Sequence, residues 1–387
     1  MSAPDVLVIG AGITGAAAAL ALAEAGARVE IVDRYGPAAM ASGWTLAGVR
    51  QSGRHAAELP LAREAVALWP ELDRTLEADT GYRQHGNLRL ARDAGEVETL
   101  KALVAEQKAA GLDLALLPDL AAVREVAPAL SSAVLAASWC PTDGHADPVA
   151  TVLAFLDRAE RLGARVSMGE RILRLEAEGG RVTEAITDRR RIAAGTVLAA
   201  PGIFVNAMLE PLGLSIPLRR PMVTVVRTAP CAPLLRPVLG VANADMAARQ
   251  EVSGRLRVTS GAEAWAGALS ETDRGPVVRP TARQVMDGIG RVAAVLPALA
   301  EAEVESVWGG VLDLTPDALP VVDRAPGYGN LVVAAGFSGH GFGIGPVTGP
   351  LAADLALGRR PRLALEAFRF DRFSGSARPE AELTLHG

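Results

Sequence analysis

The sequence predicts an α/β fold with a parallel sheet, into which an α+β part with an antiparallel sheet is inserted. Three observations support this prediction: a strand–glycine–helix–strand unit near the start, further buried apolar strands in the middle and near the end, and short β-rich runs over residues 218–311. The chain of 387 residues is too long for one ordinary core, and half of its residues are apolar. The length therefore suggests two domains or one large domain with an insertion.

The first unit extends from Asp5 to Asp33. An apolar run over 6–9 predicts a strand buried on both faces, and a G-x-G-x-x-G pattern, Gly10, Gly12 and Gly15, follows directly. An Ala/Leu-rich helix over 16–25 and a second apolar strand over 29–32 complete the unit. Such glycines permit a tight turn, close approach of a pyrophosphate and close helix–strand packing. The unit therefore predicts a Rossmann-like domain that binds a dinucleotide.

Asp33 ends the second strand, about twenty residues after the glycines, where a carboxylate accepts hydrogen bonds from a ribose. The same carboxylate would repel the 2′-phosphate of NADP. FAD and NAD remain as candidate ligands.

The remaining elements follow from periodicity and turn residues. Helices are predicted over 58–79, 96–110, 118–126, 149–162, 281–295 and 347–357, and strands over 82–91, 165–167, 172–178, 181–187, 191–192, 196–200, 222–228, 256–259 and 330–335. We expect residues 1–80, 144–205 and 320–387 to form the dinucleotide-binding domain. Residues 81–143 and 206–319 then form the substrate-binding domain.

A second glycine-rich segment, Gly336 to Pro346, follows the apolar strand near the end and precedes a helix. Glycines here allow backbone N–H groups to approach a flat ligand, and the helix dipole favours developing negative charge. A reduced flavin carries such charge at its N1/C2=O edge, whereas nicotinamide does not. This segment favours FAD over NAD.

Composition excludes several classes of function. The net charge is −5 and no basic block is present, so nucleic acid and anionic membranes are not expected as partners. The sequence shows neither a signal peptide nor a membrane span, and a cytoplasmic location is expected. The two cysteines and five histidines lack metal-ligand spacing, so no metal is expected.

Several motifs together resemble one family. The segments DVLVIGAGITG, DGHADP, VLAAPG, WGGVLDLTPDALPVVD and AAGFSGHGFGIGP occur in the order found in FAD-dependent amine and amino-acid oxidoreductases such as sarcosine oxidase, glycine oxidase and D-amino-acid dehydrogenase. The resemblance implies FAD as cofactor and hydride removal from a carbon bearing an amine, giving an imine. It implies FAD contacts from Gly10, Gly12, Ile13, Thr14, Gly15, Asp33, Arg34, Ser42, Thr45, Leu46, Gly48, Ile172, Ala200, Gly202, Gly310, Phe337, Ser338, Gly339, Gly341, Phe342, Gly343 and Ile344.

Family substrates usually carry a carboxylate, and Arg50 stands where sarcosine oxidase-like proteins place a carboxylate-binding arginine. The family's partner lysine is Gly343 here, so a larger or differently held substrate is expected, with help from another arginine of the second domain. His55 and His340 are further candidates for the active site. The side chains that attach flavin covalently in some relatives are replaced by Thr45 and Gly310, which predicts non-covalent FAD.

Two alternatives remain open. A 2-hydroxy-acid dehydrogenase of the same fold would need a base, for which His55 or His340 is the candidate. The chain could also be the flavin-bearing subunit of a larger dehydrogenase. Residues 256–263 lack the lysine that sarcosine oxidases use toward oxygen. We therefore expect a dehydrogenase that passes electrons to a quinone, a dye-like carrier or a partner subunit.

Overall fold

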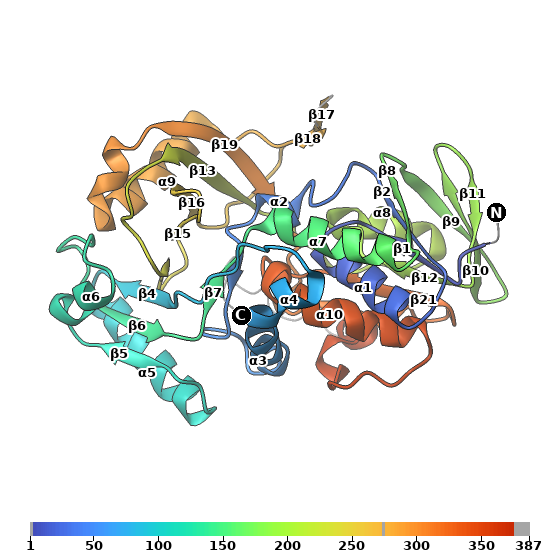
Figure 1. Cartoon of the computed structure of the whole chain (residues 1–387), viewed down its shortest axis with the longest axis horizontal. Helices are drawn as coiled ribbons and strands as arrows, with labels where there is room; N and C mark the ends of the chain where they lie inside the picture. Colours follow the sequence, from blue (N-terminus) through green and yellow to red (C-terminus); the bar gives the residue numbers. More distant parts are fainter. Residues whose placement is uncertain (1–2, 273–274, 375–387) are drawn as a thin grey trace.

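The computed structural model describes residues 3–272 and 275–374 and shows two lobes, each built on its own sheet (Figure 1). The first lobe contains a six-stranded sheet in the order β20-β21-β12-β1-β2-β8. Its strands are β1 (Val6–Ile9), β2 (Val29–Asp33), β8 (Arg165–Met168), β12 (Thr196–Ala199), β20 (Val321–Arg324) and β21 (Leu331–Ala335). All neighbours are parallel except β20 and β21. This is the predicted Rossmann-like sheet.

Helix α1 (Ile13–Glu24) packs against both α7 (Pro148–Arg161) and α10 (Gly341–Ala356) over one face of this sheet, as Figure 1 shows. The core of the other face is closed by β9 (Ile172–Glu178), β10 (Arg181–Thr187), β11 (Arg191–Ala193) and α8 (Val205–Leu209). Parallel strands covered on both faces need continuous apolar runs, and β1 and β21 are buried along their whole length.

The second lobe contains an eight-stranded sheet in the order β19-β13-β16-β15-β14-β4-β6-β5. Its strands are β4 (Asn87–Ala91), β5 (Ala115–Leu117), β6 (Ala136–Cys140), β13 (Met222–Pro230), β14 (Val238–Val241), β15 (Met246–Gln250), β16 (Arg255–Ser260) and β19 (Val304–Val311). The pair β4–β14 is parallel and all other neighbouring pairs are antiparallel. This one parallel pair joins the two chain segments that we assign to the substrate-binding domain.

Smaller elements complete the chain. Helices α5 (Ala94–Ala109), α6 (Leu120–Val126) and α9 (Ala282–Val295) accompany the second sheet, and α2 (Ala41–Trp44) lies in the loop after β2. Two-stranded pairs are formed by β3 (Gly48–Val49) with β7 (Gly144–His145) and by β17 (Ser270–Thr272) with β18 (Gly275–Val277). Over the described parts of the chain, no helix has the length and apolar character needed to cross a bilayer. We retain the ranges 1–80, 144–205 and 320–387, and 81–143 and 206–319, as a proposed domain division.

The structure corrects three element boundaries. The helix predicted over 58–79 is divided into α3 (Leu59–Leu68), a 3-10 turn over Trp69–Glu71 and α4 (Leu72–Leu76), because Pro70 cannot continue the helical hydrogen bonding. The strand predicted over 82–91 begins only at Asn87. The helix predicted from residue 347 already begins at Gly341, so the glycine-rich segment forms its first two turns.

Candidate active site

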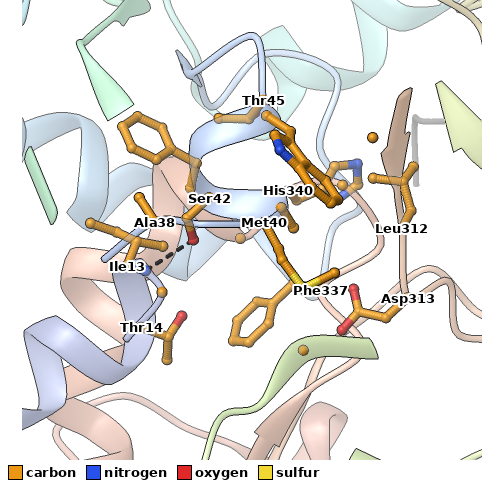
Figure 2. A pocket seen from close by; sticks show the side chains of 18 of the residues that line it. Ile13, Thr14, Ala38, Met40, Ser42, Thr45, Leu312, Asp313, Phe337 and His340 are labelled. Carbon is orange, nitrogen blue, oxygen red and sulfur yellow. Dashed lines mark hydrogen bonds between the residues drawn. The ribbon is translucent and has the colours of Figure 1, made fainter. Parts of the chain in front are cut away.

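A long cavity lies at the carboxyl ends of the parallel strands, between the first sheet and the second (Figure 2). Its walls come from the β1–α1 turn, the end of β2, the loop around α2, the residues after β12, the end of β19 and the start of α10. In doubly wound α/β sheets, this edge is where ligands bind.

The β1–α1 turn forms the phosphate-binding end of the cavity. Gly10 has φ +106°, and a Cβ atom there would lie 2.3 Å from the carbonyl oxygen of Ala200, so only glycine fits. Gly12 begins α1 without a capping side chain of its own, and Ser42 Oγ accepts a hydrogen bond from Ile13 N at 3.0 Å, as Figure 2 shows. The N-terminus of α1 therefore presents positive potential to a ligand lying along the turn.

The Asp33 carboxylate stabilises this turn through hydrogen bonds to backbone N–H groups. It accepts hydrogen bonds from Ala11 N at 2.8 Å, from Tyr35 N at 2.7 Å and from Gly36 N at 3.0 Å. Burial raises the pKa of Asp33, while the three backbone donors act in the opposite direction. The carboxylate also lines the cavity, where a ribose hydroxyl could donate to it.

The start of α10 forms a further part of the cavity wall. A Cβ atom on Gly343 would lie 3.0 Å from the carbonyl oxygen of Gly48, so a lysine at this position would need the two backbone segments to separate. The Gly343 carbonyl accepts a hydrogen bond from Trp69 Nε1 at 2.7 Å. This close approach leaves little space for a side chain at position 343.

The segment that precedes α10 is supported by Asp313, whose Oδ2 accepts a hydrogen bond from Gly336 N at 2.8 Å. Asp313 is buried, lines the cavity and lies beside Phe337 (Figure 2). Burial raises its pKa to about 6, against the opposing effect of the backbone donors. Asp313 lies within the segment WGGVLDLTPDALPVVD, but the sequence pattern did not single it out as a site residue.

Another part of the cavity wall is formed by arginine and histidine side chains. Arg50 follows β3 and donates from Nη1 to the carbonyl oxygen of Ser52 at 2.8 Å. Arg54 and Arg89 line the cavity beside it, and both are buried. His340, also buried, hydrogen-bonds through Nδ1 to Glu58 Oε2 at 3.2 Å, and burial lowers its pKa. A neutral imidazole therefore faces the cavity at neutral pH.

Most of the predicted site residues line this one cavity, and three do not. Those that line it are Gly10, Gly12, Ile13, Thr14, Gly15, Asp33, Arg34, Ser42, Thr45, Leu46, Gly48, Arg50, Ile172, Ala200, Gly202, Gly310, Phe337, Gly339, His340, Gly341, Phe342 and Gly343. Ser338 is buried behind the lining and accepts a hydrogen bond from Thr315 N, and Ile344 packs into the core. His55 is exposed, its Nδ1 accepts from Ala57 N, and we do not include it in the proposed site.

Sequence reasoning missed Arg54, Glu58 and Arg89. The spacing of four residues from Arg50 to Arg54 and from Arg54 to Glu58 was visible, but it does not identify a site because such spacing also occurs on ordinary solvated segments. Arg89 reaches the cavity only through the parallel pairing of β4 with β14. The sequence of β4 contains no pattern that predicts its pairing with β14.

The groups that line the cavity fit FAD. A glycine turn that excludes side chains, the N-terminus of α1 and the Asp33 carboxylate suit the phosphates and adenosine of FAD. Within residues 3–272 and 275–374, no group of three or more His, Cys, Asp or Glu side chains is arranged to hold a metal ion.

Comparisons with known proteins agree with this geometry. A sequence model of the family described as "FAD dependent oxidoreductase" matches residues 5–355. An uncharacterized oxidoreductase of Bacillus subtilis, YurR, is 27% identical over 94% of this chain and 97% of its own length. A D-amino acid dehydrogenase of Methylobacterium radiotolerans is 26% identical over 95% of this chain and 99% of its own.

Among solved structures, glycine oxidase from Geobacillus kaustophilus superposes with a TM-score of 0.89 at 24% identity, over 96% of this chain and 99% of that one, which confirms the fold. The resemblance noted from the sequence motifs is confirmed by the family match. The chain belongs to the FAD dependent oxidoreductase family.

Proposed function

We propose that the protein oxidises the C–N bond of an amino acid or an N-substituted amino acid to an imine, with FAD as the hydride acceptor. The observation that carries this proposal is that Arg50, Arg54 and Arg89 line the same cavity as the glycine turn between β1 and α1. A guanidinium group binds a carboxylate in a planar, bidentate manner, which fixes the carbon that bears the amine.

The chain's own residues would hold FAD in three places. The β1–α1 turn binds the phosphates, Asp33 binds the ribose of the adenosine, and the loop 42–48 with the start of α10 encloses the isoalloxazine. FAD supplies the two-electron chemistry. The protein supplies orientation and exclusion of water, and a neutral amine needs no strong base. This accords with the neutral state of His340.

Arg50→Lys tests the role of the guanidinium. The lysine keeps the positive charge but loses the planar pair of donors, so KM for a carboxylate substrate is expected to rise about tenfold or more, with flavin content unchanged. Steady-state kinetics and the ratio of flavin to protein absorbance measure both effects. Arg63→Lys, on the exposed face of α3, is the matched control. A KM equal to that of the wild type would contradict the assignment.

We further propose that FAD is bound non-covalently. Thr45 and Gly310 line the cavity at the positions where relatives carry an attachment residue, and neither side chain can form a bond to a flavin methyl group. Precipitation with acid is therefore expected to leave the yellow colour in the supernatant. Colour that stays in the pellet after washing would refute this.

A second candidate, oxidation of a 2-hydroxy acid, is favoured by one observation. His340 faces the cavity while Glu58, buried behind it, hydrogen-bonds its Nδ1, an arrangement that orients an imidazole as a base. A dye-reduction screen over both enantiomers of common amino acids, N-methyl amino acids and 2-hydroxy acids distinguishes the candidates. Reduction by amino acids alone supports the first, and reduction by hydroxy acids alone overturns it.

A further inference from the structure

Strand β14 contains a glycine that the packing of the described chain does not require. The backbone of Gly240 is outside the left-handed region, and no atom lies within 4 Å of the position that its Cβ would take. A glycine inside a strand costs backbone entropy, and it marks a bulge, a tight bend or the close approach of another group. Both pairings of β14 keep a regular register, so no bulge accounts for Gly240.

Other strand glycines differ from Gly240 in this respect. A Cβ atom on Gly144 of β7 would lie 2.3 Å from the carbonyl oxygen of Arg83, and one on Gly309 of β19 would lie 2.6 Å from Met222 Sδ. Neighbouring atoms of the protein therefore exclude a side chain at those two positions. At Gly240, the group that approaches must come from a ligand.

The open space at Gly240 belongs to the cavity. Leu239 and Val241, the residues on either side of it, are buried in the core that this sheet shares with α9. Successive side chains of a strand point to opposite faces, so the Cβ position of Gly240 is on the other face. Gly240 itself lines the cavity.

Gly240 is part of a row of residues that crosses four strands. Arg89 of β4 and Ala247 of β15 lie opposite Gly240 on its two sides, and Thr259 of β16 lies opposite Ala247. All four residues line the cavity, and we call this row the cavity floor. The Arg89 guanidinium lies against Gly53, so it does not fill the space at Gly240. The two residues at the centre of the floor are therefore a glycine and an alanine, next to open space.

The surroundings of this space are those of a substrate group that carries no charge. The residues that we assign to FAD include none from β4, β14, β15 or β16, so the cavity floor is separate from the proposed cofactor contacts. Val238, two residues before Gly240, and Val223 of β13 also line the cavity from this sheet. Apolar side chains of this kind bind apolar groups through the hydrophobic effect.

We propose that the space above Gly240 and Ala247 binds a large apolar side chain of the substrate. The substrate class is then an amino acid or N-substituted amino acid with a branched aliphatic or aromatic side chain, and Gly240 determines which sizes fit. This inference rests on the proposed function, because that function supplies the amino acid. It deepens the proposal by naming the side chain.

The test is a titration of the holoenzyme with two carboxylic acids, followed through the absorbance of the bound flavin. Propionate and 3-phenylpropionate differ by one phenyl ring, and neither carries an amine that could be oxidised. Burial of the ring is expected to make 3-phenylpropionate bind at least about tenfold more tightly than propionate.

Gly240→Val places three carbon atoms in the space that the ring would occupy. It is expected to bring the ratio of the two affinities close to one, with the ratio of flavin to protein unchanged. Because valine favours strands and glycine does not, the thermal stability of this variant should equal or exceed that of the wild type. A glycine with a merely structural role would give the opposite change in stability.

Gly290→Val is the matched control, since Gly290 also has no atom within 4 Å of its Cβ position but lies in α9, outside the cavity lining. It is expected to keep the affinity ratio of the wild type. If Gly240→Val does not fold, Ala247→Leu provides the second variant and is expected to lower the same ratio.

Three results would overturn the inference. The first is a wild type that binds 3-phenylpropionate no more tightly than propionate. The second is a ratio that survives the added side chain at position 240 or 247. The third is a folded Gly240→Val protein that has lost FAD, because the space would then belong to the cofactor.

The titration measures binding and requires no turnover, so its outcome is separate from that of the proposed function. A protein that prefers 3-phenylpropionate but oxidises no amine keeps the side-chain site and refutes the proposed function. A protein that oxidises alanine and phenylalanine with equal kcat/KM keeps the proposed function and refutes the side-chain site.

Discussion

Asp33→Ala is expected to release FAD on gel filtration, with the dissociation constant for FAD raised roughly 10²–10⁴-fold. The estimate follows from two charge-assisted hydrogen bonds to the ribose at about 1.5–3 kcal/mol each. The variant also leaves the N–H groups of Ala11, Tyr35 and Gly36 without their acceptor, which weakens the turn that holds the phosphates. Fluorescence titration of the apoprotein with FAD measures the change.

The control must separate loss of FAD from loss of stability. Glu30→Gln serves this purpose, because Glu30 is a buried carboxylate on the same strand that pairs with Arg190 and hydrogen-bonds Ser167 but does not line the cavity. It is expected to lower the thermal stability while the affinity for FAD stays near that of the wild type. Full retention of FAD by Asp33→Ala would show that the ribose is held elsewhere.

The position of Asp33 at the end of β2 was predictable because the sequence pattern of a βαβ unit is local. Strand, glycines, helix and second strand are adjacent in the chain, and the parallel strand order then places their ends at one edge. The strands 196–199 and 331–335 were predictable for a related reason: strands buried on both faces must be continuously apolar.

The start of α10 was predicted wrongly because tertiary contacts outweigh helix propensity there. Glycine disfavours a helix, yet a Cβ atom on Gly345 would lie 2.6 Å from Ile13 Cγ2, so the close packing of α10 against α1 requires glycine inside the helix. The break at Pro70 is the opposite case. Proline is a local indication that a helix ends, but the helical periodicity of the apolar residues favoured one continuous helix.

The substrate end was less predictable than the cofactor end. Arg50 could be placed by resemblance, but Arg54 and Arg89 come from different lobes and meet only after the sheets form. The hydrophobic periodicity of β4 and β14 does not indicate that these two distant strands pair with each other. Arg54 and Arg89 could therefore be assigned to the cavity only from the structure.

Reduced enzyme mixed with air-saturated buffer in the presence of its substrate is expected to reoxidise about a hundredfold more slowly than it turns over with a dye. Oxygen reduction begins with superoxide, which a fixed positive charge stabilises in a dry site, and one such group changes a rate by about 10²–10³. The chain has only two lysines, Lys101 and Lys108, both in α5 and outside the cavity lining. A lysine near the flavin is therefore absent from the cavity that the structure describes.

Arg257, on the strand where sarcosine oxidases carry their lysine, does not replace it. Its Nε pairs with Glu251 at 2.7 Å, and its Nη1 donates to the carbonyl oxygen of Thr45 at 2.7 Å. The guanidinium therefore binds the loop around Thr45 and does not line the cavity. Arg50, Arg54 and Arg89 interact with Glu58 and Asp143 and, in the proposed function, with the carboxylate of the substrate. We therefore expect bound substrate to weaken their effect on superoxide.

Stopped-flow mixing decides between dehydrogenase and oxidase. Thr259 lines the cavity on the same strand as Arg257, so Thr259→Lys should raise the rate constant for oxygen while that of Thr259→Met, an uncharged substitution of comparable length, stays low. A gain confined to the lysine variant would attribute the slow reaction of the wild type to the missing charge. Reoxidation of the wild type as fast as its turnover would instead make the protein an oxidase, with a different cation near the flavin supplying the electrostatic stabilisation.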